Sequence, residues 1–238
     1  MSETVVVVVP DADILASAVA ARLVVKIIDA QAVRGSAGVV LTGGRIAAKV
    51  LRSLKDLPAA GAIEWSRVDL WWGDERFLPA GDPDRNETQA REAVLDSLPL
   101  DAARVHAMPA SDGPDGDDAE AAAARYAAEV DGAHFDVLML GVGEDGHVAS
   151  LFPGNPARHA TGSAVAVHDS PKPPPTRISL TMPTIRTADE VWLIASGPDK
   201  AGPVGQAVAG AGDLPAGSAK GTSRTFWLLD RESAAKVA

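Results

Sequence analysis

Short apolar runs of strand length alternate along this chain with longer stretches in which apolar residues recur at helical spacing. The short runs are rich in β-branched residues and are apolar at consecutive positions, which is typical of strands buried on both faces of a parallel sheet. The pattern predicts strands at residues 5–9, 38–41, 68–72, 105–108, 135–140, 191–195 and 226–229.

Helical patterns fill the intervals between these strands. We predict helices at residues 13–32, 119–130 and 231–237. Three more helices are predicted with looser bounds: one follows the segment 42–44 and ends near residue 54, one follows the polar loop 73–86 and ends near residue 95, and one begins after Lys200. The alternation favours one α/β domain over residues 1–238, with a mostly parallel open sheet and helices on both faces, the Rossmann-like three-layer α/β/α architecture. The proline-rich segment 170–175 is too short to separate two domains, and we interpret it as a stiff loop.

Composition and charge restrict the partners of the chain. Hydrophobic residues make up 46% and charged residues 23%, and the absence of cysteine excludes disulfides, thiolate metal sites and cysteine nucleophiles. The 22 Lys and Arg against 32 Asp and Glu give a net charge of −10, which repels nucleic acids and anionic membranes. Because no signal segment or membrane span is evident, we expect a cytoplasmic protein, and the acidic surface is compatible with a monomer. An anionic ligand would require basic residues gathered at its site.

Four segments that follow predicted strands hold an unusual share of the glycines and charged residues: 42–45, 73–76, 141–147 and 196–200. Ligands of open α/β sheets bind beyond the carboxyl ends of the strands, so we expect a site where these segments converge. Gly43 and Gly44 suit phosphate capture, because glycines allow close approach and a helix N-terminus presents free N–H groups. A tight strand-to-helix turn accounts for the same two glycines equally well.

The segment 141–147 places His147 in a glycine-rich loop beside Glu144 and Asp145. An imidazole near neutral pKa is a natural general base, and an adjacent carboxylate can fix its tautomer and stabilise its cation. The sequence does not separate Asp145 from Glu144 in that role, and a histidine that caps the next helix is the structural alternative. The other histidines lack a glycine-rich context, and no pair has metal-ligand spacing, so we expect no metal site.

Further polar candidates follow the other strands. Asp74, Glu75 and Arg76 come directly after residues 68–72, where a charge cluster is either surface ion pairing or part of a site. The Arg76 guanidinium is suited to hold an oxyanion or carboxylate through two hydrogen bonds. Arg177 and Lys200 are each more typical of solvated charges when taken alone, but together with Gly43 and Gly44 they would form the required basic pocket.

Six segments, in this order, resemble the 6-phosphogluconolactonase family, which shares its fold with glucosamine-6-phosphate deaminases. They are TGG at 42–44, WWGDER at 71–76, DPDRNETQA at 82–90, FDVLMLGVGEDGHVASLFPG at 135–154, SPKPPPTRISLT at 170–181 and VWLIASGPDKA at 191–201. The resemblance spans most of the chain, and the block around His147 is highly specific.

The resemblance implies hydrolysis of a phosphorylated sugar lactone without cofactor or metal. His147 would deprotonate the attacking water, Asp145 would orient the imidazole, and Arg76 would steady the oxyanion. The phosphate would be held by Gly43, Gly44, Arg45, Arg177 and Lys200. Asp74 and Asn86 would lie near the sugar. One departure is that Arg45 and Ile46 follow the glycine pair where the family often has a serine or threonine, so either the Arg45 guanidinium replaces those hydroxyl contacts or it points elsewhere.

Two alternatives are weighed against this function. A related deaminase would carry a glutamate five residues after the histidine, where this chain has Phe152, and usually a tyrosine or similar group at the position of Arg76. A non-catalytic sugar-phosphate sensor is compatible with the fold, but the chain has no helix-turn-helix segment and no basic DNA-binding patch. Lactone hydrolysis is therefore the favoured interpretation.

Overall fold

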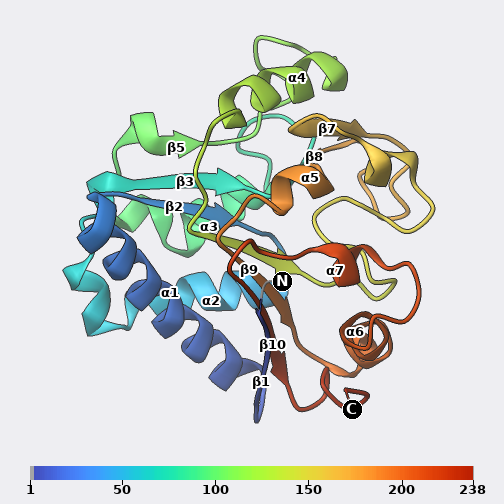
Figure 1. The fold of residues 1–238 in the computed structure, drawn as a ribbon. Coiled ribbons are helices and arrows are strands. Elements are labelled where there is room, and N and C mark those ends of the chain that lie inside the picture. The colour runs from blue at the N-terminus through green and yellow to red at the C-terminus, as the bar shows by residue number, and fades with distance from the viewer. Residues whose placement is uncertain (1–2, 238) are drawn as a thin grey trace.

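A parallel β-sheet forms the centre of the computed structural model, which describes residues 3–237. Within this range, seven strands pair in the order β1-β10-β9-β6-β2-β3-β5, and every pairing is parallel (Figure 1). They are β1 (Glu3–Val9), β2 (Ala37–Leu41), β3 (Val68–Trp72), β5 (Val105–His106), β6 (Val137–Gly141), β9 (Glu190–Ala195) and β10 (Arg224–Asp230). The predicted parallel α/β sheet is confirmed.

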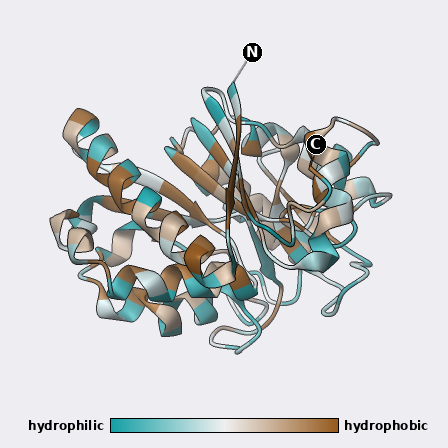
Figure 2. Ribbon diagram, turned by 90° about the horizontal axis from the view of Figure 1, so that it is seen from below, coloured by the Kyte–Doolittle hydropathy of each residue, from teal (hydrophilic) through white to brown (hydrophobic). Residues whose placement is uncertain are grey.

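Helices flank the sheet, and the hydrophobic strands lie between them in the interior (Figure 2). The helices are α1 (Ala12–Arg34), α2 (Arg45–Lys55), α3 (Asn86–Ala93), α4 (Ala119–Val130), α5 (Met182–Ile185), α6 (Ala201–Val208) and α7 (Pro215–Ser218). Asp11 caps α1, since its carboxylate accepts the N–H groups of Asp13 and Ile14, and Gly35 ends the helix in the left-handed conformation. No helix among residues 3–237 is both long and apolar enough to cross a bilayer.

A second, antiparallel sheet was not predicted from the sequence. It consists of β4 (Asp74–Arg76), β8 (Arg177–Leu180) and β7 (Ala164–Val167), in the order β4-β8-β7 within the described part of the chain. Part of the predicted polar loop 73–86 is therefore a strand, because the polar side chains of β4 find buried partners rather than water. The sheet lies beside α4 and α5 (Figure 1).

The predicted helix at 231–237 is wrong, because these residues form successive turns. The Asp230 carboxylate accepts the backbone N–H of Ser233 at 2.8 Å and the hydroxyl of Ser196 at 2.6 Å. The end of β10 is thus tied to the loop that follows β9. This side-chain bonding fixes a turn directly after the strand, where apolar spacing alone suggests helix.

The order of the strands creates a crevice between the ends of β2 and β6. From β2 the chain proceeds to β3 and β5 on one side, whereas from β6 it proceeds to β9 and β10 on the other. Loops that leave two adjacent parallel strands in opposite directions open a crevice beyond the carboxyl ends, which is the usual ligand site of such folds. The loops after β2 and β6 are the ones that carry Gly43, Gly44 and His147.

Candidate active site

A cavity of about 630 Å³ lies beyond the carboxyl ends of the strands and is lined by all four of the predicted loop segments. Most of the predicted site residues line this one cavity: Gly43, Gly44, Arg45, Asp74, Arg76, Asn86, His147, Arg177 and Lys200. Asp145 does not line the cavity but lies behind the imidazole of His147. The residues that the sequence predicted from separate segments are therefore brought together.

The imidazole of His147 is held by a carboxylate on one side and an aromatic ring on another. Its Nδ1 lies 2.5 Å from Oδ1 of Asp145, and the same oxygen accepts the backbone N–H of His147 at 3.1 Å. The ring of Phe152 packs against the imidazole with 4.4 Å between centroids. Only 16% of the His147 side chain is exposed. Asp145, rather than Glu144, is the carboxylate that contacts this ring.

The ionisation of Asp145 determines which imidazole nitrogen is basic. Partial burial favours the neutral carboxyl group, but the hydrogen bond and charge of His147 outweigh it and lower the pKa of Asp145 to about 2. At neutral pH the carboxylate can only accept a hydrogen bond, so Nδ1 of His147 carries the proton that it donates. The other nitrogen, Nε2, is then the basic atom of the neutral ring.

Glycines of the His147 loop make room for this arrangement. A Cβ atom on Gly143 would lie 2.0 Å from Nδ1 of His147 and 2.6 Å from Oδ1 of Asp145, so a side chain there would displace the pair. Gly146 adopts a φ of +82°, a conformation that favours glycine, and its N–H donates to the carbonyl of Gly143 at 3.0 Å. The glycines thus fix the position of the imidazole.

Pairing between β4 and β8 gathers three further charged groups. Arg76 lies opposite Arg177 in the antiparallel register, and Asp74 lies opposite Ser179. Because side chains alternate along a strand, Asp74 and Arg76 share one face. Asp74 accepts the hydroxyl of Ser150 at 2.7 Å and lies 4.0 Å from Nη1 of Arg177. Arg76 donates from Nη1 to the carbonyl of Asp84, and its buried Nε has no hydrogen-bond partner among the described residues.

Asn86 begins α3 and packs against the loop after β2. Its Nδ2 donates to the backbone carbonyl of Asp74 at 2.9 Å. A Cβ atom on Gly43 would lie 1.9 Å from Oδ1 of Asn86, so the asparagine fits only beside a glycine. Within residues 3–237, Oδ1 of Asn86 is buried without a hydrogen-bond partner. Gly43 therefore has a packing role in addition to its predicted role toward phosphate.

Glu75 anchors this part of the site, a role that the sequence analysis did not assign to it within the cluster at residues 74–76. Its side chain is 1% exposed and accepts the backbone N–H groups of Arg76, Asn86 and Glu87 at 2.8, 2.7 and 2.9 Å. Burial raises the pKa of Glu75 to about 7, although the nearby Arg85 and these N–H groups act in the opposite direction. Glu75 points away from Asp74 and Arg76 because β4 is paired with β8, and no local sequence signal marks this strand.

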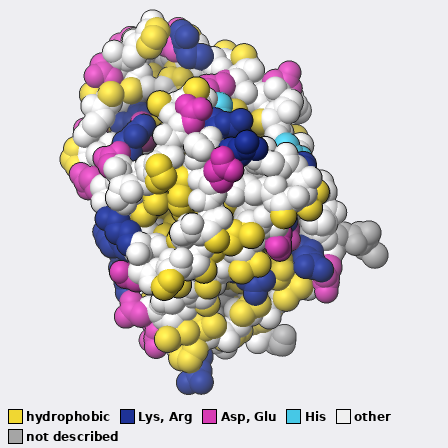
Figure 3. Space-filling view, turned by 90° about the vertical axis from the view of Figure 1, so that its left-hand side faces the viewer, with side chains coloured by type: hydrophobic (Ala, Val, Ile, Leu, Met, Phe, Trp, Pro, Cys, Tyr) yellow, Lys and Arg dark blue, Asp and Glu magenta, His cyan; other side chains and the backbone are white. Residues whose placement is uncertain are grey.

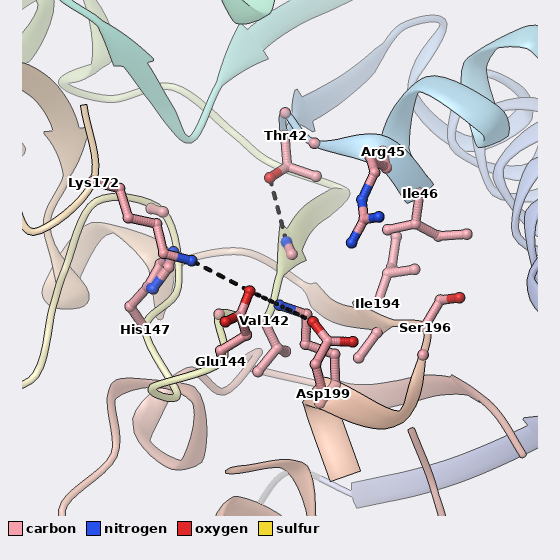
Figure 4. Close-up of a pocket in the computed structure, with 18 of the residues that line it drawn as sticks. Thr42, Arg45, Ile46, Val142, Glu144, His147, Lys172, Ile194, Ser196 and Asp199 are labelled. Atoms are coloured by element: carbon pink, nitrogen blue, oxygen red, sulfur yellow. Dashed lines mark hydrogen bonds and ion pairs between the residues drawn. The ribbon is translucent and has the colours of Figure 1, made fainter. Parts of the chain in front are cut away.

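Cationic side chains also line the cavity, where Lys172 lies beside His147 and Arg45 lies apart from them (Figure 4). We define the cationic rim as Arg45, Lys172 and Lys200, all of which line the cavity. Lys172 was not predicted. Arg177 donates from Nε and Nη2 to the backbone carbonyls of Lys172, Pro173 and Pro174, and so secures the proline-rich loop that brings Lys172 to the cavity.

Three side chains of types that can bind metals gather at the amino ends of β6 and β9, away from the cavity. In the described part of the chain, ligand atoms of His134, Asp136 and Asp189 lie within 4.8 Å of one another, just before β6 and β9 begin. Asp136 already pairs with the guanidinium of Arg34 and accepts the N–H of Gly38 at 2.8 Å, so it is satisfied without an ion.

On the face seen in Figure 3, Lys and Arg side chains are interspersed with Asp and Glu side chains and form no continuous patch of one sign.

Comparison with known proteins identifies relatives of this chain. The sequence model of the family of glucosamine-6-phosphate isomerases and 6-phosphogluconolactonases matches residues 10–227. A 6-phosphogluconolactonase of Streptomyces coelicolor is 58% identical, covering 100% of this chain and 96% of the relative. A 6-phosphogluconolactonase of Mycobacterium tuberculosis is 49% identical over 96% of each chain.

The fold leads to the same group of proteins. The solved structure of a 6-phosphogluconolactonase from Trypanosoma brucei superimposes with a TM-score of 0.82 and 26% sequence identity, covering 100% of both chains. The matched region contains every residue that lines the cavity. The chain therefore belongs to the family of glucosamine-6-phosphate isomerases and 6-phosphogluconolactonases.

Proposed function

We propose that this protein hydrolyses 6-phosphogluconolactone to 6-phosphogluconate and that His147 is the general base. The observation that carries the proposal is that His147, whose Nδ1 is held by Asp145, lines the same cavity as the cationic rim. The relatives from Streptomyces coelicolor and Mycobacterium tuberculosis bear the name of this activity and align over nearly their whole length. A cytoplasmic location stays a prediction.

The chemistry follows from the orientation of the imidazole. Nε2 of His147 takes a proton from water as the water oxygen attacks the lactone carbonyl carbon, and the carbonyl oxygen becomes an oxyanion. The Arg76 guanidinium stabilises this charge, since part of it is buried without a partner among residues 3–237. The ring C–O bond then breaks, the ring oxygen takes the proton from His147, and the new carboxylic acid releases a proton to solvent.

The rest of the cavity would position the substrate. The backbone N–H groups of Gly43 and Gly44 at the start of α2, together with the cationic rim, would bind the phosphate. Arg177 stays a predicted phosphate ligand, although Nε and Nη2 already donate to loop carbonyls. Asn86 would accept a hydrogen bond from a sugar hydroxyl through Oδ1, and Asp74 would lie beside it.

Phe152 favours hydrolysis over deamination. It stands where a deaminase is expected to carry a glutamate, and its ring is 1% exposed and packed on His147. A carboxylate for proton transfer during ring opening is therefore replaced at this position by an apolar group. Removal of this acid leaves the lactone hydrolysis described above intact, because that reaction needs only the base and the oxyanion donors.

The test is hydrolysis of freshly prepared 6-phosphogluconolactone, followed by proton release with the spontaneous rate subtracted. We expect His147→Ala to lose about 10²- to 10⁴-fold in kcat and to approach the spontaneous rate. Binding of 6-phosphogluconate, measured by calorimetry, should persist because the cationic rim is unchanged. Full activity of the variant would contradict the mechanism.

A further inference from the structure

Glu144 places a carboxylate between two cations of the rim. Its Oε1 lies 3.8 Å from Nζ of Lys172 and 3.7 Å from Nζ of Lys200 (Figure 4). The three residues come from different elements: Glu144 from the loop that holds His147, Lys172 from the proline-rich loop, and Lys200 from the segment before α6. One carboxylate oxygen thus joins three segments across the cavity.

The contact between the Glu144 carboxylate and the two lysines is loose, so the carboxylate can move away from them. Both distances exceed the 2.7–3.2 Å of a hydrogen bond, so neither ammonium group is satisfied by Glu144. The Glu144 side chain is 59% exposed, and an ion pair of this exposure has little strength. Because water replaces such a contact at small cost, a stronger anion can displace the carboxylate from the two lysines.

The charges at this position are balanced before any ligand binds. Lys200 also pairs with Asp199 at 3.3 Å, so two ammonium groups face two carboxylates. An incoming anion must therefore compete with an anion that the protein itself supplies. A phosphate dianion interacts with both lysines more strongly than a single carboxylate does, whereas a monoanionic or neutral group has no such advantage.

We propose that Glu144 is a specificity-determining residue that occupies the phosphate subsite in the free protein and is displaced by a dianionic phosphate group. The inference rests on the proposed function, since it assigns the lysines to the substrate phosphate. Competition by Glu144 lowers the affinity of every anion at the subsite by the same factor, so a monoanion, which the two lysines attract less strongly, is left with too little affinity to occupy it. It also favours departure of the phosphorylated product, because the carboxylate returns to the lysines as the phosphate leaves.

The experiment compares Glu144→Gln with the native protein. We expect the KM for 6-phosphogluconolactone and the Kd for 6-phosphogluconate to fall about two- to fivefold, because the internal competitor loses its charge. Binding of gluconate, which lacks the phosphate, should not change. Raised ionic strength should narrow the difference between the two proteins, since the competing charges are exposed.

Glu64→Gln is the matched control. Glu64 is 60% exposed and pairs with Arg67 at 3.0 Å, and neither residue lines the cavity. This variant removes the same charge from the protein without touching the subsite, so its KM and Kd should equal the native values. A fall of similar size in both variants would overturn the inference, because net charge alone would then explain it.

An unchanged or raised KM in Glu144→Gln would also overturn the inference, and a raised value would mean that Glu144 holds the lysines in place for the substrate. The inference would also be overturned if Glu144→Gln bound gluconate and 6-phosphogluconate more tightly by the same factor.

Titration with inorganic phosphate needs no turnover and separates this test from the proposed function. If the native protein fails to hydrolyse the lactone while Glu144→Gln still binds phosphate more tightly, only the proposed reaction is wrong.

Discussion

Two sets of groups in the cavity, which we call the fixed side and the cationic rim, are built in opposite ways. The fixed side consists of His147, Arg76 and Asn86, which are held by short hydrogen bonds and close packing. In the cationic rim, Lys172 and Lys200 meet Glu144 only at 3.7–3.8 Å, and Lys172 is 45% exposed. The difference teaches that bond-making groups require fixed geometry, whereas charges that capture an anion act over longer distances and tolerate movement.

Gly143→Ala tests the fixed side most severely. The added methyl group would push the imidazole away from Asp145, and a displacement of about 1 Å in a catalytic group costs about hundredfold in rate. We expect kcat for the lactone to fall by about that factor with little change in KM. Gly202→Ala is the control, because a Cβ atom at Gly202 in α6 meets nothing within 4 Å. Native kcat in Gly143→Ala would mean that the imidazole position does not matter.

Lys200→Ala and Lys172→Ala test the cationic rim. We expect each to raise the KM for 6-phosphogluconolactone about tenfold, because one charged hydrogen bond to phosphate is lost, with a smaller effect on kcat. Turnover of an unphosphorylated lactone should be the same in both variants as in the native protein. If these variants lose kcat and keep the native KM, the contrast between the fixed side and the cationic rim is wrong.

The pH dependence of stability tests the anchor beneath the fixed side. The pKa of Glu75 rises from 4.5 to about 7 on folding, so the folded chain binds this proton more tightly than the unfolded chain does. The stabilisation is fully present below pH 4.5 and is lost as pH rises through about 7. Between pH 5 and 8, the Tm of the native protein should therefore fall more steeply than that of Glu75→Gln, by a few degrees. Parallel slopes in the two proteins would exclude this role of Glu75.

Sequence reasoning identified the parts of the protein that depend on local pattern. Continuous apolar runs identify the strands of the parallel sheet, and the short spacing between Asp145 and His147 within a glycine-rich loop leads to their contact. The sequence left Glu144 and Asp145 as equal candidates, because adjacent residues differ only in the direction that the folded loop gives them. The structure separates them, since Glu144 turns to the lysines and Asp145 to the imidazole.

Long-range pairing was beyond sequence reasoning. Nothing local marks residues 74–76 as a strand, because their polar side chains are buried through contacts with Ser150, Asn86 and Arg177 that lie far away in the sequence. The anchoring role of Glu75 was missed for the same reason. The proline-rich segment was correctly interpreted as a loop, but its role in carrying Lys172 depends on Arg177 reaching back to its carbonyl groups.

The antiparallel register of β4 and β8 restricts how this region of the protein can vary in length. Arg76 and Arg177 face each other, and the next residue, Ile178, points to the opposite side of the small sheet. Inserting one residue within β8 would exchange these two side chains and bring an isoleucine to the position of a guanidinium. Natural variants and designed chimaeras should therefore rarely carry a single insertion between residues 177 and 180.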